Sequence, residues 1–326
     1  MSTIGLGNAL VDVLLKLHSD AELAEIGIAK GAMDMINENT MRIIQQKLAS
    51  LERTQSPGGS VCNAMRAIAC LGGRAGFFGK IGTDELGEYY EKSLLSAGVE
   101  PYFTKEPGIS GCCTVLISPD GERSMGTFLG PAPTLTPEDI SEDIIDHYDC
   151  IYIEGYMVVN ESLVCSTMEK AKRLGVKVAL DLSNFNIVNS FKNTLSRLIA
   201  EYVDILFSNE AESKAFTGLD ADMALVELSK LTEIAVVTLG KNGAIVAGHG
   251  ETIHVDAYGT DKPLDTTGAG DHFAAGFLYS LSEGASLEKA ARTGALLAGH
   301  VVNVVGPQIP LDGWELIKLK VNNILS

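Results

Sequence analysis

Residues 265–271 read DTTGAGD, and the apolar residues directly after them recur at helical spacing, so this stretch lies where a helix begins. The first N–H groups of a helix have no partner within it, and the helix dipole leaves about half a positive charge there. Gly268, Ala269 and Gly270 have almost no side chain, so an anion can approach their backbone closely. Asp271 falls in the first turn, beside that anion. Amides that hold a phosphate, next to a carboxylate that can take a proton, indicate phosphoryl transfer to an alcohol.

The same stretch has a simpler interpretation. A helix can start after a glycine-rich turn for structural reasons alone, and Asp271 would then only complement the helix dipole. Taken alone, the stretch supports the two interpretations equally, so the rest of the chain has to decide between them.

Composition excludes several classes of protein. The chain has 326 residues, is 46% hydrophobic and carries a net charge of −17, which suits one large α/β domain and argues against a nucleic-acid partner. A small phosphate ligand remains compatible, because a helix N-terminus holds phosphate without a basic patch. No apolar run reaches the roughly 18 residues of a membrane helix, and the N-terminus lacks the basic start of a secretory signal. The six cysteines form no C-x-x-C pair, so we expect reduced thiols, no structural zinc and a cytoplasmic location.

The second half of the chain predicts a parallel sheet. Apolar, β-rich strands are expected at 149–153, 177–181, 204–208 and 233–239, with helical segments between the first three. Such strands indicate a parallel sheet covered on both faces, in which ligands bind beyond the carboxyl ends. Polar residues and a glycine stand at those ends: Glu154, Asp181, Ser183, Asn209, Glu212, Thr238 and Gly240.

A second, smaller sheet is expected from the first half. Strand-like segments at 99–103, 112–118 and 123–128 follow one another without helices, and Pro119-Asp120-Gly121 predicts a hairpin turn between the last two. We group them with the segments 11–17 and 30–36 as one sheet formed by about 11–36 and 99–130. Residues 56–60 are interpreted as a sharp turn before a buried helix over 61–71.

Two common nucleotide motifs are absent. The glycine pattern that begins at Gly5 has Leu10 where a dinucleotide fingerprint requires its third glycine, which excludes an NAD-linked dehydrogenase site there. The pair Gly79-Lys80 is not a Walker A loop, because Arg74 and Ile81 occupy positions that require glycine and Ser/Thr.

The motifs together resemble those of the ribokinase-like, or PfkB-type, carbohydrate and nucleoside kinases. DTTGAGD matches the C-terminal signature of that family, and Gly58-Gly59 with Asn63, Ala64 and the pair Leu71-Gly72 is similar to its N-terminal signature. The similarity runs over essentially the whole chain. It implies a ribokinase-like three-layer α/β/α fold in one domain, 1–326, with a mostly parallel central sheet and a small β-sheet lid.

The resemblance also implies roles for individual residues. Asp271 would be the general base, and Gly268, Ala269 and Gly270 would form the anion hole for the transferring phosphate. ATP would be bordered by Thr238, Gly240, Gly243, Asn209, Gly268 and Gly270, and the acceptor hydroxyls by Asn8, Asp12, Gly58, Gly59 and Asn63. For Asn8 and Asp12, an ordinary loop role is an equally good interpretation.

Two cation sites follow from the resemblance. Asn209 and Glu212 fit an N-x-x-E motif that orders Mg²⁺ through water, and their position after a strand favours this role over a plain helix cap. Asp265 and Thr267, with residues 304–306 nearby, fit a site for a monovalent cation such as K⁺. His272, directly after the base, is less typical of the family pattern and receives no role.

The acceptor is harder to predict. GNALVD at 7–12, KGAM at 30–33, GERSM at 121–125 and EGY at 154–156 look most like the adenosine-kinase-type branch. Met33 and Phe128 would then cover a purine, although both also fit a role in the core of the lid. Alternatives are a sugar kinase acting on ribose, fructose or 2-keto-3-deoxygluconate, and a non-catalytic nucleotide or sugar sensor. The family allows a homodimer through the lid, and no membrane partner is expected.

Overall fold

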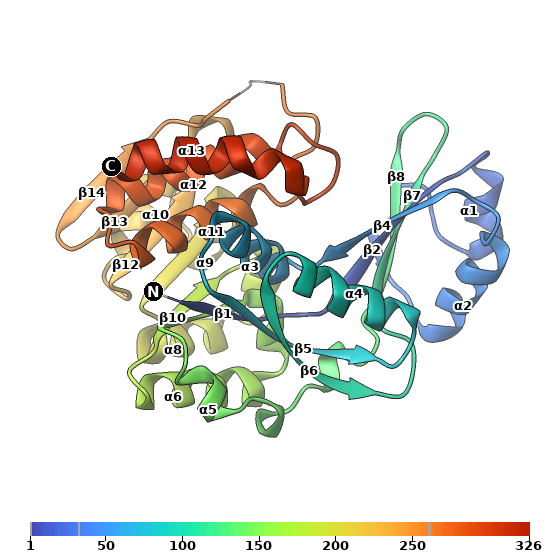
Figure 1. Cartoon of the computed structure of the whole chain (residues 1–326), viewed down its shortest axis with the longest axis horizontal. Helices are drawn as coiled ribbons and strands as arrows, with labels where there is room; N and C mark the ends of the chain where they lie inside the picture. The colour runs from blue at the N-terminus through green and yellow to red at the C-terminus, as the bar shows by residue number, and fades with distance from the viewer. Residues whose placement is uncertain (1, 32, 260–261) are drawn as a thin grey trace.

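A computed structural model describes residues 2–31, 33–259 and 262–326, without the side chain of Met33. Within them a nine-stranded sheet has the order β14-β13-β12-β11-β10-β9-β1-β5-β6 (Figure 1). Neighbouring strands from β6 to β12 in this order pair in parallel, whereas β12, β13 and β14 pair antiparallel. The strands are β1 (Thr3–Leu6), β5 (Ala75–Gly82), β6 (Val99–Glu106), β9 (Cys150–Glu154), β10 (Lys177–Asp181), β11 (Ile205–Asn209), β12 (Ile234–Thr238), β13 (Ala244–Gly248) and β14 (Glu251–Val255).

Helices cover both faces of this sheet because its strands are apolar on both sides. Along β9, Ile151 and Ile153 belong to one hydrophobic cluster, and Cys150 and Tyr152 belong to the other. The first cluster includes α5 (Glu142–Ile145), α6 (Glu161–Arg173), α7 (Phe185–Ser190), α8 (Lys192–Tyr202), α9 (Glu210–Thr217) and α10 (Ala221–Leu228). The second includes α3 (Ser60–Leu71), α4 (Glu85–Ser96), α11 (Ala269–Ser282), α12 (Leu287–Val301) and α13 (Trp314–Leu325). The predicted α/β/α layers are therefore present.

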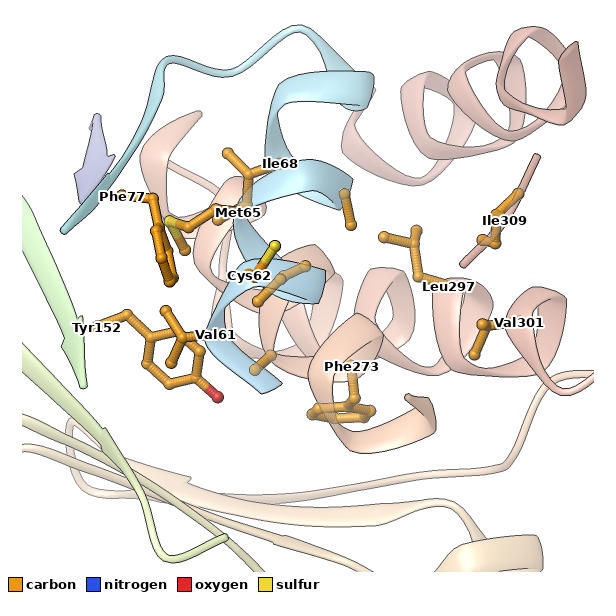
Figure 2. Close-up of a cluster of buried hydrophobic side chains, with 14 of the residues drawn as sticks. Val61, Cys62, Met65, Ile68, Phe77, Tyr152, Phe273, Leu297, Val301 and Ile309 are labelled. Carbon is orange, nitrogen blue, oxygen red and sulfur yellow. The ribbon is translucent and has the colours of Figure 1, made fainter. Parts of the chain in front are cut away.

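The buried helix α3 connects the sheet to the C-terminal helices. Figure 2 shows Val61, Cys62 and Met65 of α3 between sheet residues such as Tyr152 on one side and Leu297 of α12 on the other. All of these side chains are fully buried. The packing holds the N-terminus of α3 against the N-terminus of α11, which is where the site described below lies. Among the described residues, none of the helices combines the length and hydropathy that crossing a bilayer requires.

The smaller sheet stands beside the large one as a lid (Figure 1). Its order is β3-β8-β7-β2-β4, and α1 (Ala21–Ile26) and α2 (Glu38–Lys47) pack on one of its faces. Its strands are β2 (Leu10–Lys16), β3 (Met33–Met35), β4 (Arg53–Gly58), β7 (Gly111–Ile117) and β8 (Arg123–Phe128). Short 3-10 turns connect elements elsewhere: η1 (Ala132–Thr134), η2 (Pro137–Asp139), η3 (Gly155–Val159), η4 (Gly240–Asn242) and η5 (Leu311–Gly313).

Two expectations about the lid are wrong. The segment 99–103 does not join it, because β6 pairs in parallel with β5 along its whole length and forms an edge of the large sheet. Residues 53–58 do join it, since β4 pairs antiparallel with β2 where we expected only a turn over 56–60. Pro57 made the strand hard to predict, because proline donates no ladder hydrogen bond and argues against a central strand. It is tolerated here because β4 is an edge strand.

Candidate active site

The polar residues predicted at the carboxyl ends of the strands do come together. Glu154 of β9 is in register with Asp181 of β10, and Asn209 of β11 with Thr238 of β12. Parallel strands end at the same edge of a sheet, so their last residues line one crevice. Asn8, which follows β1, joins them by donating from Nδ2 to Oε1 of Glu154 at 2.7 Å.

Asp271 is held at this crevice by two donors from α3. The Ser60 hydroxyl donates to its Oδ1 at 2.6 Å, and Nδ2 of Asn63 donates to its Oδ2 at 2.7 Å. Nε2 of Gln308 donates in turn to Oδ1 of Asn63, which fixes which end of that amide faces Asp271. Burial raises the pKa of Asp271 to about 6, although the two hydrogen bonds lower it. The carboxylate is therefore ionised at neutral pH, and its pKa is close to the value that suits a general base there.

The glycine-rich loop before Asp271 presents backbone donors. Gly268 is the N-cap of α11 in the left-handed conformation, with φ of 78°, which an L side chain rarely adopts. The N–H of Ala269 donates to the carbonyl of Thr266 at 3.2 Å, so this amide is already engaged. Those of Gly270 and Asp271 donate to no acceptor among the described residues. The N–H of Gly268 likewise donates to no acceptor among these residues, so two amides of the predicted trio 268–270 are unengaged and that of Ala269 is not.

Several acidic side chains share the crevice, and burial raises their pKa values. Burial, followed by the charge of Asp271, raises the pKa of Asp12 to about 7. Burial likewise raises the pKa of Glu154 to about 7, and its Oε2 is buried without a hydrogen-bond partner in the described structure. The pKa of Asp181 is also raised by burial, while its carboxylate accepts from Tyr152 and from the N–H of Ser183. A cation entering the crevice would stabilise the ionised form of these carboxylates and offset the repulsion between their charges.

Asn209 and Glu212 form a capping box at the start of α9. The Asn209 side chain accepts from the Glu212 N–H, and the Glu212 carboxylate accepts from the N–H and Nδ2 of Asn209 at 2.8 and 2.7 Å. Burial, then the charge of Asp181, raises the pKa of Glu212 to about 8. The helix-cap interpretation is therefore realised in the structure, at the edge of the same crevice. It does not exclude a second role, because each carboxylate oxygen has two lone pairs.

These oxygens fit a magnesium ion only through water. Within the described residues, no three His, Cys, Asp or Glu side chains are close enough to ligate a metal together. Magnesium keeps several of its waters and binds through one or two carboxylates plus substrate phosphates, so such a group is not required. A hydrated Mg²⁺ nearby would lower the raised pKa values of Glu212 and Asp181, because its charge favours the ionised carboxylates.

A cavity of about 210 Å³ adjoins the glycine-rich loop. It brings together Thr238, Gly240 and Gly243 with Gly270, as expected for the residues that border ATP. Three small residues of α12 also line this cavity: Ala295, Ala298 and Gly299.

Both carboxylate oxygens of Asp265 already accept hydrogen bonds. Its Oδ1 accepts from the N–H and Oγ1 of Thr267, and its Oδ2 accepts from the N–H of Gly306 and from Nη1 of Arg123 at 3.2 Å. These donors hold the pKa of Asp265 down at about 2, even though burial alone would raise it. Arg123 belongs to lid strand β8, so this ion pair connects the lid to the glycine-rich loop.

The lid contributes Asp12 and Gly58 to the acceptor side, and Gly59 follows as the N-cap of α3. A Cβ on Gly58 would lie 2.5 Å from the Asp12 carboxylate, and one on Gly59 would lie 2.5 Å from the Asn8 carbonyl oxygen. Both positions therefore require glycine because of close packing beside the crevice. Phe128 is in register with Cys112 on the face covered by α1 and α2 and packs against the core there, which is the lid-core role left open for it; its contact with a purine stays a prediction. The side chain of Met33 lies outside the described residues.

Sequence reasoning missed three side chains of the site. Ser60 directly follows the Gly58-Gly59 pair at the start of a helix, a position that could have marked it as a donor into the crevice. Arg123 lies inside the GERSM segment, whose sequence indicates only a family resemblance and no contact with Asp265. Gln308 carries no local signal, because only the folded chain brings it to Asn63, 245 residues away.

Comparisons with known proteins agree with this geometry. A family model described as pfkB family carbohydrate kinase matches residues 24–314. The solved adenosine kinase from Sinorhizobium meliloti is 33% identical, with 98% of each chain covered and a TM-score of 0.86. A probable sugar kinase from Rhizobium etli is 30% identical over 98% of each chain, with a TM-score of 0.83. Adenosine kinase from Saccharomyces cerevisiae is 28% identical over 94% of this chain and 96% of the relative.

Proposed function

The chain belongs to the pfkB family of carbohydrate kinases, and on that premise we propose that it transfers the γ-phosphate of ATP to the primary hydroxyl of a nucleoside, with adenosine as the preferred acceptor. Kinases of this family are phosphotransferases that act on hydroxyl groups. ATP, bound with Mg²⁺, supplies the phosphoryl group. The chain itself supplies a base, backbone donors and a surface that orients the acceptor.

Asp271 is the proposed base. Its carboxylate is ionised at neutral pH because its pKa is about 6, and Ser60 and Asn63 hold both of its oxygens in place. The hydroxyl proton of the acceptor would move to this carboxylate as the oxygen attacks the γ-phosphorus, the bond from that phosphorus to the β–γ bridging oxygen breaks and ADP leaves. The N–H groups of Gly270 and Asp271, at the positive end of α11, would face the charge that develops on the phosphoryl oxygens.

An apolar strip on the open face of the lid is the observation that favours a nucleoside as the acceptor. Leu14, Val115 and Met125 are in register across β2, β7 and β8. They face away from α1 and α2, because the alternate residues Val13 and Thr114 lie on the helix-covered side. None of the three belongs to either hydrophobic cluster of the protein, and Val115 is only 8% exposed. A flat nucleobase would cover this strip, while Asp12 and Asn63 bind the ribose hydroxyls.

A sugar acceptor is the second candidate. The similarity to a probable sugar kinase favours it, because the polar residues around Asp12 and Asn8 would suit any polyol. A monosaccharide would leave Leu14, Val115 and Met125 uncovered by the ligand, which is why we rank it second.

The test is a kinase assay with ATP and Mg²⁺ against adenosine, inosine, ribose, fructose and 2-keto-3-deoxygluconate in parallel. We expect the highest kcat/KM with adenosine, and Asp271→Ala should abolish turnover while ATP still binds. Val115→Asn should raise KM for adenosine by about tenfold, since it places a polar amide against the adenine ring. Val159→Asn makes the same substitution at an exposed position and is the matched control. Turnover of sugars but not nucleosides would reverse our ranking, and ATP binding without any turnover would indicate a sensor.

Three further expectations remain proposals. Asn209 and Glu212 would order Mg²⁺ through water, so chelation of divalent cations should stop turnover. A K⁺ ion at Asp265 and Thr267 would have to displace Arg123, so a requirement for K⁺ would argue that this ion pair opens. Dimerisation through the lid edges β3 and β4, and a cytoplasmic location, also stay predictions.

A further inference from the structure

His272 directly follows the proposed base and has no role in the mechanism above. Its side chain is 1% exposed, and its Nδ1 lies 2.9 Å from the carbonyl oxygen of Gly268. A carbonyl oxygen can only accept, so Nδ1 carries the hydrogen. Nε2 is buried and has no hydrogen-bond partner in the described structure. Burial lowers the pKa of His272 to about 4, which keeps the ring neutral and in this one tautomer at neutral pH.

Both hydrogens that reach the Gly268 carbonyl come from His272. The His272 backbone N–H donates to it at 2.9 Å, as the helix requires, and the ring adds a second bond to the same oxygen. Most helix N-caps use a side-chain oxygen to hold the first turn, but Gly268 has no side chain and no side-chain cap bond. The ring of His272 therefore supplies from inside the helix the restraint that a capping side chain would supply from outside.

Residues near the C-terminus hold the ring and the loop from behind. The ring stacks on Trp314 with centroids 6.3 Å apart and planes inclined by 20°. The indole N–H of Trp314 donates to the carbonyl of Ile309 at 3.4 Å. Pro307 packs so closely behind Gly268 that a Cβ there would lie 3.0 Å from it. The loop before α13 and the start of α13 thus brace His272 and Gly268 together.

We propose that His272 is a positioning residue for the phosphate-binding loop. Its Nδ1–H holds the carbonyl of Gly268, so that the N–H groups of Gly270 and Asp271 keep a fixed direction toward the transferring phosphoryl group. The inference rests on the anion-binding role proposed above for this loop. Oriented amides stabilise the charge of the transition state more than that of bound ATP, so the bond serves kcat rather than KM.

Two variants separate the hydrogen bond from the packing. His272→Phe keeps a ring against Trp314 but cannot donate, whereas His272→Asn loses the ring but places an amide nitrogen where it can reach the carbonyl four residues earlier. Losing an anion-hole donor outright costs about 10²–10³ in kcat, and loosening donors that remain present should cost less, about tenfold. We expect His272→Phe to lower kcat about tenfold with KM for ATP within about twofold, and His272→Asn to stay within about twofold of the unmodified protein in kcat.

The assay is steady-state phosphorylation of the best acceptor, with thermal unfolding to check folding. Trp314 is the only tryptophan, so its fluorescence reports whether the surroundings of residue 272 are intact. His254→Asn, at an exposed position of β14, is the control. If His272→Phe does not fold, His272→Leu takes its place as the variant without a donor.

The outcomes are distinct. A ring that only fills space predicts the reverse order, with the Phe variant active and the Asn variant unstable, and that result would overturn the proposal. Equal loss in both variants would overturn it as well. If the unmodified protein phosphorylates no acceptor at all, the proposed function fails first; if it is active and His272→Phe is equally active, only this inference fails.

Discussion

Replacing Ser60 by alanine should raise the pKa of the proposed base. The Ser60 hydroxyl is 2.6 Å from Oδ1 of Asp271, and a hydrogen bond to a charged group contributes about 1.5–3 kcal/mol. Taking the lower end, and about 1.4 kcal/mol for each pKa unit, the pKa would rise from about 6 by roughly one unit. Asn63 still donates to the other oxygen, so the carboxylate stays in place.

This shift has a defined signature in the pH profile of kcat/KM, which reports the free enzyme. A rise of about one unit lowers the ionised fraction of Asp271 at about pH 6 from about a half to about a tenth, so the rate there falls about fivefold. Near pH 8 the two proteins should differ by less than about 15%. Ser196→Ala, an exposed helical serine far along the chain, is the matched control.

The measurement needs only initial rates between about pH 5 and 9 at acceptor concentrations well below KM, where the rate is proportional to kcat/KM. If the acid limb of Ser60→Ala coincides with that of the unmodified protein, Asp271 is not the group whose ionisation limits the rate, or Ser60 does not bond it. A limb displaced toward lower pH would contradict the sign of the argument.

Three further predictions follow from the same contacts. The pKa values of Asp12, Glu154 and Glu212 are about 7, 7 and 8 in the folded protein but close to 4 in the unfolded chain. The folded state therefore binds more protons between about pH 4 and 8, so the free energy of unfolding should fall as pH rises through that range. A thermal unfolding midpoint that is not lower at about pH 8 than at about pH 5.5 contradicts this. Asn209→Ala removes a capping box and should cost about 1 kcal/mol in urea unfolding, and an unchanged midpoint would count against it. Arg123→Gln breaks the partly exposed pair with Asp265, worth about 1 kcal/mol, and should lower kcat/KM for the acceptor about fivefold without unfolding the protein; full activity would exclude a role for this lid contact.

Local patterns predicted much of the fold. The near-continuous apolar runs of β9, β10 and β11 are buried on both faces, so their hydrophobicity alone marks a covered parallel sheet. The DTTGAGD stretch marks a helix start because its small residues and its acid suit the unpaired N–H groups. Position after a strand then placed Glu154, Asp181 and Asn209 at one edge, and the register of the sheet confirms it.

Other features have no local signal. Whether β6 pairs with β5 or joins the lid depends on which sheet offers a free edge, and a short β-rich segment is compatible with both. The face occupied by Phe128 depends on the register of β8, because a slip of one residue would turn every side chain of the strand over. The strand β4 contains a proline followed by glycine, a sequence that is more typical of a turn than of a strand.

The chain on its own determined the kind of chemistry: a bare backbone at a helix start and an acid in the first turn of that helix are encoded within seven consecutive residues. Only the tertiary structure decided how that acid behaves. Ser60 and Asn63 reach Asp271 across more than two hundred residues, and Arg123 reaches Asp265 from the lid sheet. The physical reason is that a pKa depends on which groups exclude water and which donors lie within about 3 Å, and distant segments set both only when they pack.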